Sequence, residues 1–229
     1  MAEGREETMK YKAVIFDLDG TILNTLEDLK CSLNYALRGC GFPELTLEQV
    51  RRFLGNGIVN LVERSTPSGT SEEARLQVVE RFNGHYEEHC NDNTRPYDGI
   101  LHTLRALRAA GLLTAVVSNK PDYGVQTLIQ QNFPGLFDYV TGVKEGIRRK
   151  PAPDSVLNAL KALDCQVCQA VYIGDSEVDI ETAANAGMDC ISVDWEFRDR
   201  QQLLDAGAAC IITRPEQLET LLLRKSFLC

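Results

Sequence analysis

Five short apolar runs are separated by polar segments of helical periodicity along most of the chain. The first run, YKAVIFDL at residues 11–18, stops at Asp19-Gly20. This is typical of a strand that is buried on both faces and ends in a loop. Similar runs recur at residues 113–117, 170–173, 190–193 and 209–212, and helical spacing is found at residues 99–110, 123–132, 154–163 and 180–186. Strands that alternate with helices predict an α/β fold, a doubly wound (Rossmann-like) parallel sheet with helices on both faces.

Residues 24–94 break this alternation, because their apolar positions have helical spacing throughout. The helical stretches are residues 26–38, 46–53, 58–64 and 71–90, with turn-forming residues at 39–43, 55–57 and 66–70. We therefore expect a helical cap, residues 24–94, inserted after the first strand. Residues 1–23 and 95–229 would form the discontinuous α/β core, with crossings at Asn24 and at the Arg-Pro-Tyr of residues 95–97.

Composition and charge narrow the class of partner. The 229 residues are 44% hydrophobic and 25% charged, which is ordinary for a globular protein and excludes disordered, collagenous and coiled-coil chains. The 24 basic and 33 acidic side chains leave a net charge of -9. This is the wrong sign for a protein that binds phosphate backbones, so we expect no nucleic acid partner.

The apolar runs and the cysteines indicate the cellular location of the protein. No run approaches the roughly 20 apolar residues of a membrane span, and the first residues, MAEGREETMKYK, are polar. We expect no membrane association and a cytoplasmic protein with reduced thiols. The single CxxC at Cys165 and Cys168 has no second pair at metal-ligand spacing, which favours a structural role. Monomer and homodimer both remain open.

Two carboxylates stand at the end of the first predicted strand. Asp17 and Asp19 lie two residues apart in DLDGT, and both can approach one ligand if the chain leaves the strand there. Gly20 permits such a turn because it lacks a side chain. In open α/β sheets the ligand site lies at the carboxyl ends of the strands.

Further polar residues follow the later strands. Ser118 and Asn119 follow residues 113–117, Lys150 precedes the helix at 154–163, and Asp175 and Asp179 follow residues 170–173. Each of them alone could be a helix cap, a first-turn acid or a solvated loop residue. Together they map to the same rim of one sheet, which those separate roles do not predict.

Phosphoryl transfer through an aspartyl-phosphate is the chemistry that needs this set. A carboxylate attacks phosphorus only if the repulsion between the two negative groups is offset by a cation and fixed donors. Mg²⁺ suits clustered carboxylates and phosphate oxygens. A lysine supplies a point charge and a serine hydroxyl a neutral donor. A second carboxylate can protonate the leaving oxygen and then activate water.

Four motifs, in this order and spacing, resemble those of haloacid dehalogenase (HAD) superfamily phosphatases over nearly the whole chain after Lys10. They are DLDGT (residues 17–21), SN (118–119), KPAPD (150–154) and GDSEVDI (174–180). The resemblance implies a nucleophile and a general acid/base, a phosphate-binding set and a metal site. Asp17 would be the nucleophile and Asp19 the general acid/base. Ser118, Asn119 and Thr21 would bind the substrate, and Lys150 would stabilise its charge. Mg²⁺ would be bound by Asp17, Asp175 and the backbone carbonyl of Asp19, with Asp179 as support.

The cap is similar to that of phosphoglycolate phosphatases. LGNGIVNLVER (residues 54–64), NKP (119–121) and RPYDG (95–99) carry this likeness. It implies that Gly55, Asn56 and Gly57 form a loop that faces the catalytic aspartates and excludes water, above a small phosphorylated metabolite. Two departures are Asn24, where the family often has an acid, and KPAPDS in place of the commoner histidine-containing loop.

Three other activities remain to be weighed. A β-phosphoglucomutase-like enzyme of the same superfamily would return the phosphoryl group to its substrate, and a pyrophosphatase would use the same nucleophile. A dehalogenase is disfavoured because halide displacement leaves no alkoxide for Asp19 to protonate. A receiver module of signalling proteins would need only about 120 residues and an aspartate at a middle strand, whereas here the paired acids end the first.

Overall fold

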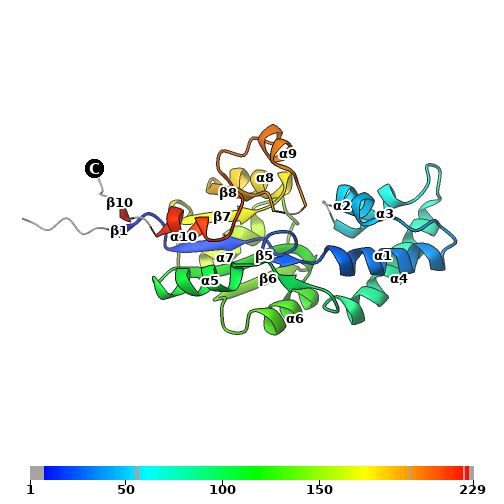
Figure 1. The fold of residues 1–229 in the computed structure, drawn as a ribbon, viewed down its shortest axis with the longest axis horizontal. Coiled ribbons are helices and arrows are strands. Elements are labelled where there is room, and N and C mark those ends of the chain that lie inside the picture. Colours follow the sequence, from blue (N-terminus) through cyan, green and yellow to red (C-terminus); the bar gives the residue numbers. More distant parts are fainter. Residues whose placement is uncertain (1–7, 55–56, 196, 224, 227–229) are drawn as a thin grey trace, which may run out of the picture.

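A six-stranded parallel sheet forms the centre of the computed structural model, which describes residues 8–54, 57–195, 197–223 and 225–226. The strand order is β6-β5-β2-β7-β8-β9 (Figure 1). The strands are β2 (Ala13–Phe16), β5 (Leu113–Pro121), β6 (Tyr139–Val143), β7 (Ala170–Gly174), β8 (Asp189–Val193) and β9 (Ile211–Ile212). Helices cover both faces, so the predicted doubly wound α/β fold is confirmed.

Alternate residues of β2 enter two separate apolar layers, as the two-residue period of a strand requires. Ala13 and Ile15 pack with helices α7 (Asp154–Ala162) and α8 (Glu177–Ala186). Val14 and Phe16 face the opposite layer, built from α5 (Ile100–Ala109), α6 (Asp122–Asn132) and α10 (Gln217–Leu222). All four side chains are fully buried. This explains why β2 itself contains no polar residue.

The order of the strands reverses at β2. The chain first adds β5 and β6 on one side of β2, and then returns to add β7, β8 and β9 on the other side. The backbone N–H of Asp17 donates to the carbonyl of Ile173, at 2.9 Å, and so continues the ladder between β2 and β7. Such a reversal leaves a crevice at the carboxyl ends of the two strands, where ligands bind in this class of fold.

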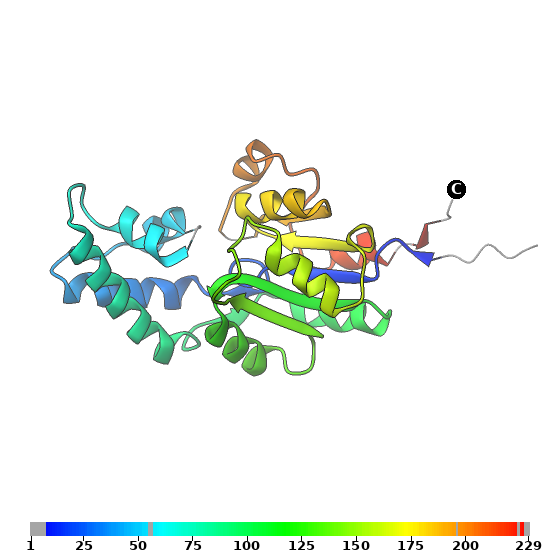
Figure 2. The ribbon, with the colours of Figure 1, turned by 180° about the vertical axis from the view of Figure 1, so that it is seen from behind.

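Four helices occupy the segment where the cap was predicted. They are α1 (Leu26–Gly39), α2 (Leu47–Phe53), α3 (Gly57–Ser65) and α4 (Glu72–His89). Figures 1 and 2 show them set apart from the sheet, beyond the end at which β2 stops. Leu33 and Leu37 of α1 and Val78 and Phe82 of α4 are buried, and they belong to the same apolar cluster as Val14 and Phe16 of the sheet.

The two chain crossings between core and cap lie side by side. β3 (Leu23–Asn24) pairs with β4 (Arg95–Pro96) in an antiparallel ribbon, with Asn24 opposite Arg95. The buried carboxylate of Asp28, on α1, accepts hydrogen bonds from the backbone N–H groups of Asn93 (3.0 Å) and Thr94 (2.8 Å). The two segments that connect these helices to the sheet therefore run together.

The structure adds elements that the sequence pattern did not predict. Strand β6 lies at the sheet edge and is only half-buried at Tyr139 and Val140, so its apolar run is short. Strand β5 continues to Pro121, which puts Ser118 and Asn119 inside the strand instead of after it. Helix α9 (Arg200–Asp205), the 3₁₀ turn Val167–Gln169 and the paired β1 (Thr8–Met9) and β10 (Lys225–Ser226) complete the fold. Within the described ranges, every helix is too short or too polar to cross a bilayer.

Candidate active site

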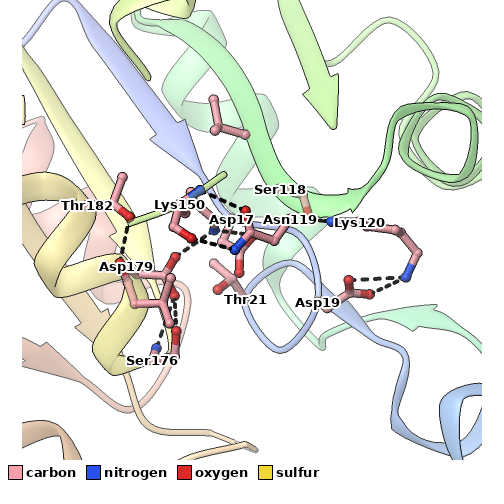
Figure 3. Close-up of polar contacts among 12 residues, drawn as sticks. Asp17, Asp19, Thr21, Ser118, Asn119, Lys120, Lys150, Ser176, Asp179 and Thr182 are labelled. Carbon is pink, nitrogen blue, oxygen red and sulfur yellow. Dashed lines mark hydrogen bonds and ion pairs between the residues drawn. The ribbon is translucent and has the colours of Figure 1, made fainter. Parts of the chain in front are cut away.

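The predicted catalytic residues meet at the carboxyl ends of β2, β5 and β7 (Figure 3). They line a cavity of about 330 Å³ between the core and the cap helices. Its core wall includes Asp17, Asp19, Ser118, Asn119, Lys120, Lys150 and Asp175, and its cap wall includes Leu29, Leu54, Ile58, Leu61, Phe82 and Tyr86. The core therefore presents charged and polar groups, whereas the cap presents mainly apolar ones.

Asp17 follows β2 directly and forms an ion pair with Lys150. The distance from Asp17 Oδ1 to Lys150 Nζ is 2.8 Å. Burial raises the pKa of Asp17 to about 7, against the lowering effect of the Lys150 ammonium and with a further rise from the nearby charge of Asp179. The carboxylate thus needs more positive charge than Lys150 provides if it is to stay ionised as a nucleophile.

Lys150 is held on every side by polar groups. Its ammonium contacts Asp179 Oδ1 at 2.8 Å and the hydroxyl of Tyr172 at 3.0 Å, in addition to Asp17. Burial acts to lower the pKa of Lys150, but the two carboxylates outweigh it and raise the pKa well above its usual value. Lys150 is therefore a fixed cation at the carboxylate of Asp17.

Asp17, Asp175 and Asp179 offer oxygens that all lie within 4.8 Å of one another. Burial raises the pKa of Asp175, and the charges of Asp179 and Asp17 raise it further. A Cβ on Gly20 would overlap the Asp175 carboxylate, so only glycine fits beside this cluster. Lys150 pairs with only two of these three buried carboxylates, so the cluster suits a divalent cation, which prefers oxygen ligands and would offset their repulsion.

Asp179 already has partners for both of its oxygens. Oδ1 is paired with Lys150, and Oδ2 accepts from the N–H (3.1 Å) and the hydroxyl (2.6 Å) of Ser176. Ser176 and Asp179 thereby form the capping box that begins α8. Asp179 is therefore placed to orient Lys150 and to support the acidic cluster.

Of the remaining predicted site residues, some line the cavity and others do not. Ser118 is buried at the cavity wall. Thr21 is not among the cavity-lining residues that the structure describes, and its hydroxyl donates to Asp175 Oδ1 at 3.0 Å. Gly57 begins α3 and lines the cavity. Gly55 and Asn56, the other two residues of the predicted cap loop, lie outside the described residues.

Asn119 contacts the lysine loop. Its Nδ2 donates to the carbonyl of Lys150 at 3.0 Å, and its Oδ1 accepts from the N–H of Lys150 at 2.9 Å. These two bonds join β5 to the segment before α7. A direct contact with the phosphate was expected from the resemblance, but the side-chain amide is engaged with Lys150.

Three further residues of the site did not follow from the sequence. Lys120 is buried, and its ammonium lies 2.9 and 3.1 Å from the two carboxylate oxygens of Asp19. Tyr172 places its hydroxyl against Lys150 from the middle of β7. Arg198 binds Glu177 and donates to the carbonyl of Leu54 in the cap at 2.9 Å. A tyrosine inside a fully buried strand is a usable signal, because its hydroxyl must find a partner.

Comparisons with known proteins agree with this geometry. Residues 14–193 match the haloacid dehalogenase-like hydrolase family. A phosphoglycolate phosphatase of Vibrio vulnificus (strain YJ016) is 35% identical over 187 residues, which cover 78% of this chain and 81% of that protein. A phosphoglycolate phosphatase of Aquifex aeolicus is 32% identical over 187 residues, 81% of this chain and 86% of that protein.

Among solved structures, a candidate phosphoglycolate phosphatase from Lactobacillus delbrueckii subsp. bulgaricus is similar over its whole length. It is 41% identical, covers 93% of this chain and 99% of its own, and superposes with a TM-score of 0.90. The fold, the grouping of Asp17, Lys150 and Asp175 at one strand edge, and these matches all indicate the same class of protein. The chain therefore belongs to the haloacid dehalogenase-like hydrolase family and is an enzyme related to the phosphoglycolate phosphatases.

Proposed function

We propose that this enzyme hydrolyses a small phosphate monoester with Mg²⁺ through a phosphorylated Asp17. The observation that carries the proposal is the position of Asp17, which is paired with Lys150 and adjoins a buried acidic cluster at the wall of one cavity. A nucleophilic carboxylate, a fixed cation and oxygen ligands for a metal are what phosphoryl transfer to an aspartate requires.

In the first step, Asp17 attacks the phosphorus atom and displaces the alcohol. Lys150 stabilises the negative charge on the phosphoryl oxygens, and the Ser118 hydroxyl donates to one of them. A bound Mg²⁺ would be held by Asp17 and Asp175 and would neutralise charge between the carboxylates and the phosphate. Asp179 takes part only through Lys150 and Ser176, because both of its oxygens are engaged there.

Asp19 is the group suited to move protons. It lines the same cavity as Asp17 but is not part of the acidic cluster, and so we assign it to the proton of the substrate instead of to the metal. It would protonate the leaving oxygen in the first step and take a proton from water in the second, when water attacks the phosphorylated Asp17.

The cap supplies the selection of substrate. The cavity of about 330 Å³ is small, which favours a small leaving group. The relatives named above, phosphoglycolate phosphatases at 32 to 35% identity, favour 2-phosphoglycolate as that substrate. We infer that residues 24–94 close over it and exclude water.

A phosphate-release assay tests the proposal. Purified protein with Mg²⁺ is offered 2-phosphoglycolate, β-glucose 1-phosphate, pyrophosphate, a nucleoside monophosphate and 4-nitrophenyl phosphate. Phosphate release with the highest kcat/KM on 2-phosphoglycolate supports both the reaction and the substrate. Conversion of β-glucose 1-phosphate to its 6-phosphate isomer would instead identify a mutase, and a lack of release from every ester would refute the proposal.

A further inference from the structure

Lys120 is a buried cation in the active-site cavity that the proposed mechanism does not use. Its side chain is 5% exposed, and its ammonium touches both carboxylate oxygens of Asp19. A third partner is the hydroxyl of Tyr86, at 2.7 Å. We propose that Lys120 and Tyr86 are positioning residues that aim the Asp19 carboxylate at the leaving group; this rests on the proposed role of Asp19 as general acid.

The contact between Lys120 and Asp19 fixes a direction. An aspartate held at only one oxygen can rotate about its terminal bond, whereas contacts to both oxygens hold the plane of the carboxylate. Figure 3 shows Asp19 and Lys120 pointing toward each other, on the side away from Asp179 and Ser176. The acid is thus kept apart from the metal cluster and directed to the cavity that would contain the alcohol.

Tyr86 ties this pair to the cap. It stands on α4, whereas Lys120 is part of core strand β5, so the bond between the Tyr86 hydroxyl and the ammonium crosses from one to the other. The Tyr86 ring lies 4.6 Å from Lys120 Nζ, close enough for a favourable cation–π contact. The position of the cap therefore bears directly on the group that holds Asp19.

Stability alone does not account for these residues. A buried ion pair contributes little to folding, since desolvation offsets most of the attraction, and apolar residues of similar volume often serve as well or better. The lining of the same cavity already contains Phe82 and Leu61, so an apolar side chain would also be compatible with it. A lysine between the proposed acid and the cap is instead what a positioning role requires.

Leaving-group dependence separates positioning from a structural role. An alkyl phosphate needs a proton on its leaving oxygen, whereas 4-nitrophenolate leaves without one. We would measure kcat/KM, which reports on the first chemical step, for 4-nitrophenyl phosphate and for the alkyl phosphate from the panel above that is turned over fastest. The variants are Lys120→Met, Tyr86→Phe and Asp19→Asn. Lys144→Met and Tyr35→Phe, exposed residues of the core and the cap, are the matched controls.

We expect Lys120→Met to lower kcat/KM for the alkyl phosphate by about 10- to 100-fold, and for the aryl phosphate by no more than about threefold. Tyr86→Phe, which is nearly isosteric, should give a smaller loss with the same selectivity. If Asp19→Asn shows the selective loss but the other two variants lose both substrates equally or neither, the inference is overturned. If Asp19→Asn itself shows no selectivity, the acid role assigned to Asp19 fails, and the inference fails with it.

Discussion

The side-chain amide of Asn119 binds both backbone groups of Lys150, although the two residues belong to different elements. The donor distance to the Lys150 carbonyl is 3.0 Å, and the distance from the Lys150 N–H to Asn119 Oδ1 is 2.9 Å. Lys150 in turn places its ammonium on Asp17. The amide therefore fixes the position of the lysine loop relative to Asp17.

The first prediction follows from that contact. Asn119→Ala removes both bonds, and a displacement of Lys150 by about 1 Å should lower kcat by roughly 10- to 100-fold with a smaller change in KM. Steady-state kinetics with the preferred phosphate ester measures this. Asn185→Ala is a matched control, because Asn185 binds the same loop from outside, at the carbonyl of Pro151. Similar losses in both variants would point to general loosening of the loop.

Asp17→Asn should remove at least about 99.9% of phosphate release while the fold is kept. An amide has the same volume as the carboxylate, but it is not an anionic nucleophile. Lys150 retains Asp179 as a partner, so no buried cation is left alone. Phosphate release and the thermal midpoint measured on one preparation check both halves of this prediction. Turnover that persists in this variant would exclude Asp17 as the nucleophile.

Removal of the metal should abolish turnover, and Mg²⁺ should restore it. The clustered oxygens of Asp17, Asp175 and Asp179 would otherwise oppose the binding of a phosphate dianion. Calcium should inhibit, because its looser and higher coordination does not hold the in-line geometry. Activity after treatment with excess chelator, followed by addition of each ion, measures this. Full activity in chelator would contradict the prediction. So would a Cys165→Ser variant that loses both bound zinc and activity, because the catalytic metal would then be zinc at that cysteine.

Metal-free protein should lose stability as the pH rises through about 7. Burial raises the pKa of Asp17 from 3.8 to about 7, so between these values the folded chain binds a proton that the unfolded chain releases. The contribution is present at the low end of that range and is lost above it. The thermal midpoint in chelator should therefore be higher at pH 6 than at pH 8, and Asp17→Asn should reduce the difference. Asp189, whose pKa is lowered by Lys10, acts only below about pH 4.

Most of the core was predictable because its signals are local. Each buried strand has a mainly apolar run, and parallel strands bring their carboxyl ends to one edge, so Asp17 and Asp175 were expected at the same rim of the sheet. Strand β6 was not predicted because its two buried positions are occupied by Thr141 and Gly142, whereas its apolar residues are only partly buried. Its run therefore resembles a loop.

Contacts between core and cap were beyond prediction for a different reason. The bond between Lys120 and Tyr86 depends on the position of α4 relative to the sheet, which the spacing of residues in the sequence does not encode. The same holds for Arg198, whose guanidinium reaches the carbonyl of Leu54. The bonds of Asn119 to Lys150 were not predicted, because a motif gives the identity of a residue and not the direction of its side chain.

Gly57 offers a test of the cap at a single atom. It begins α3 with a φ of +85°, lines the cavity, and would place a Cβ 3.4 Å from the guanidinium of Arg149 in the core. Gly69, in the loop between α3 and α4, has the same φ of +85° but no atom within 4 Å of a Cβ. Substitution would therefore strain the backbone equally at both glycines. Only at residue 57 would the new side chain lie close to another part of the protein.

Gly57→Val should lower kcat/KM for the preferred alkyl phosphate by about tenfold or more, and for 4-nitrophenyl phosphate by clearly less. We propose that most of the core groups bind phosphate and metal, so discrimination between leaving groups is expected mainly where the cap meets the core, and a branched side chain at residue 57 would hold the two apart. Gly69→Val controls for the strain of a β-branched residue at positive φ, which lowers the thermal midpoint in either variant. Equal losses on both substrates, or equal losses in both variants, would show that the start of α3 affects only the stability of the cap. A selective loss confined to Gly57→Val would mean that closure at this point chooses the substrate.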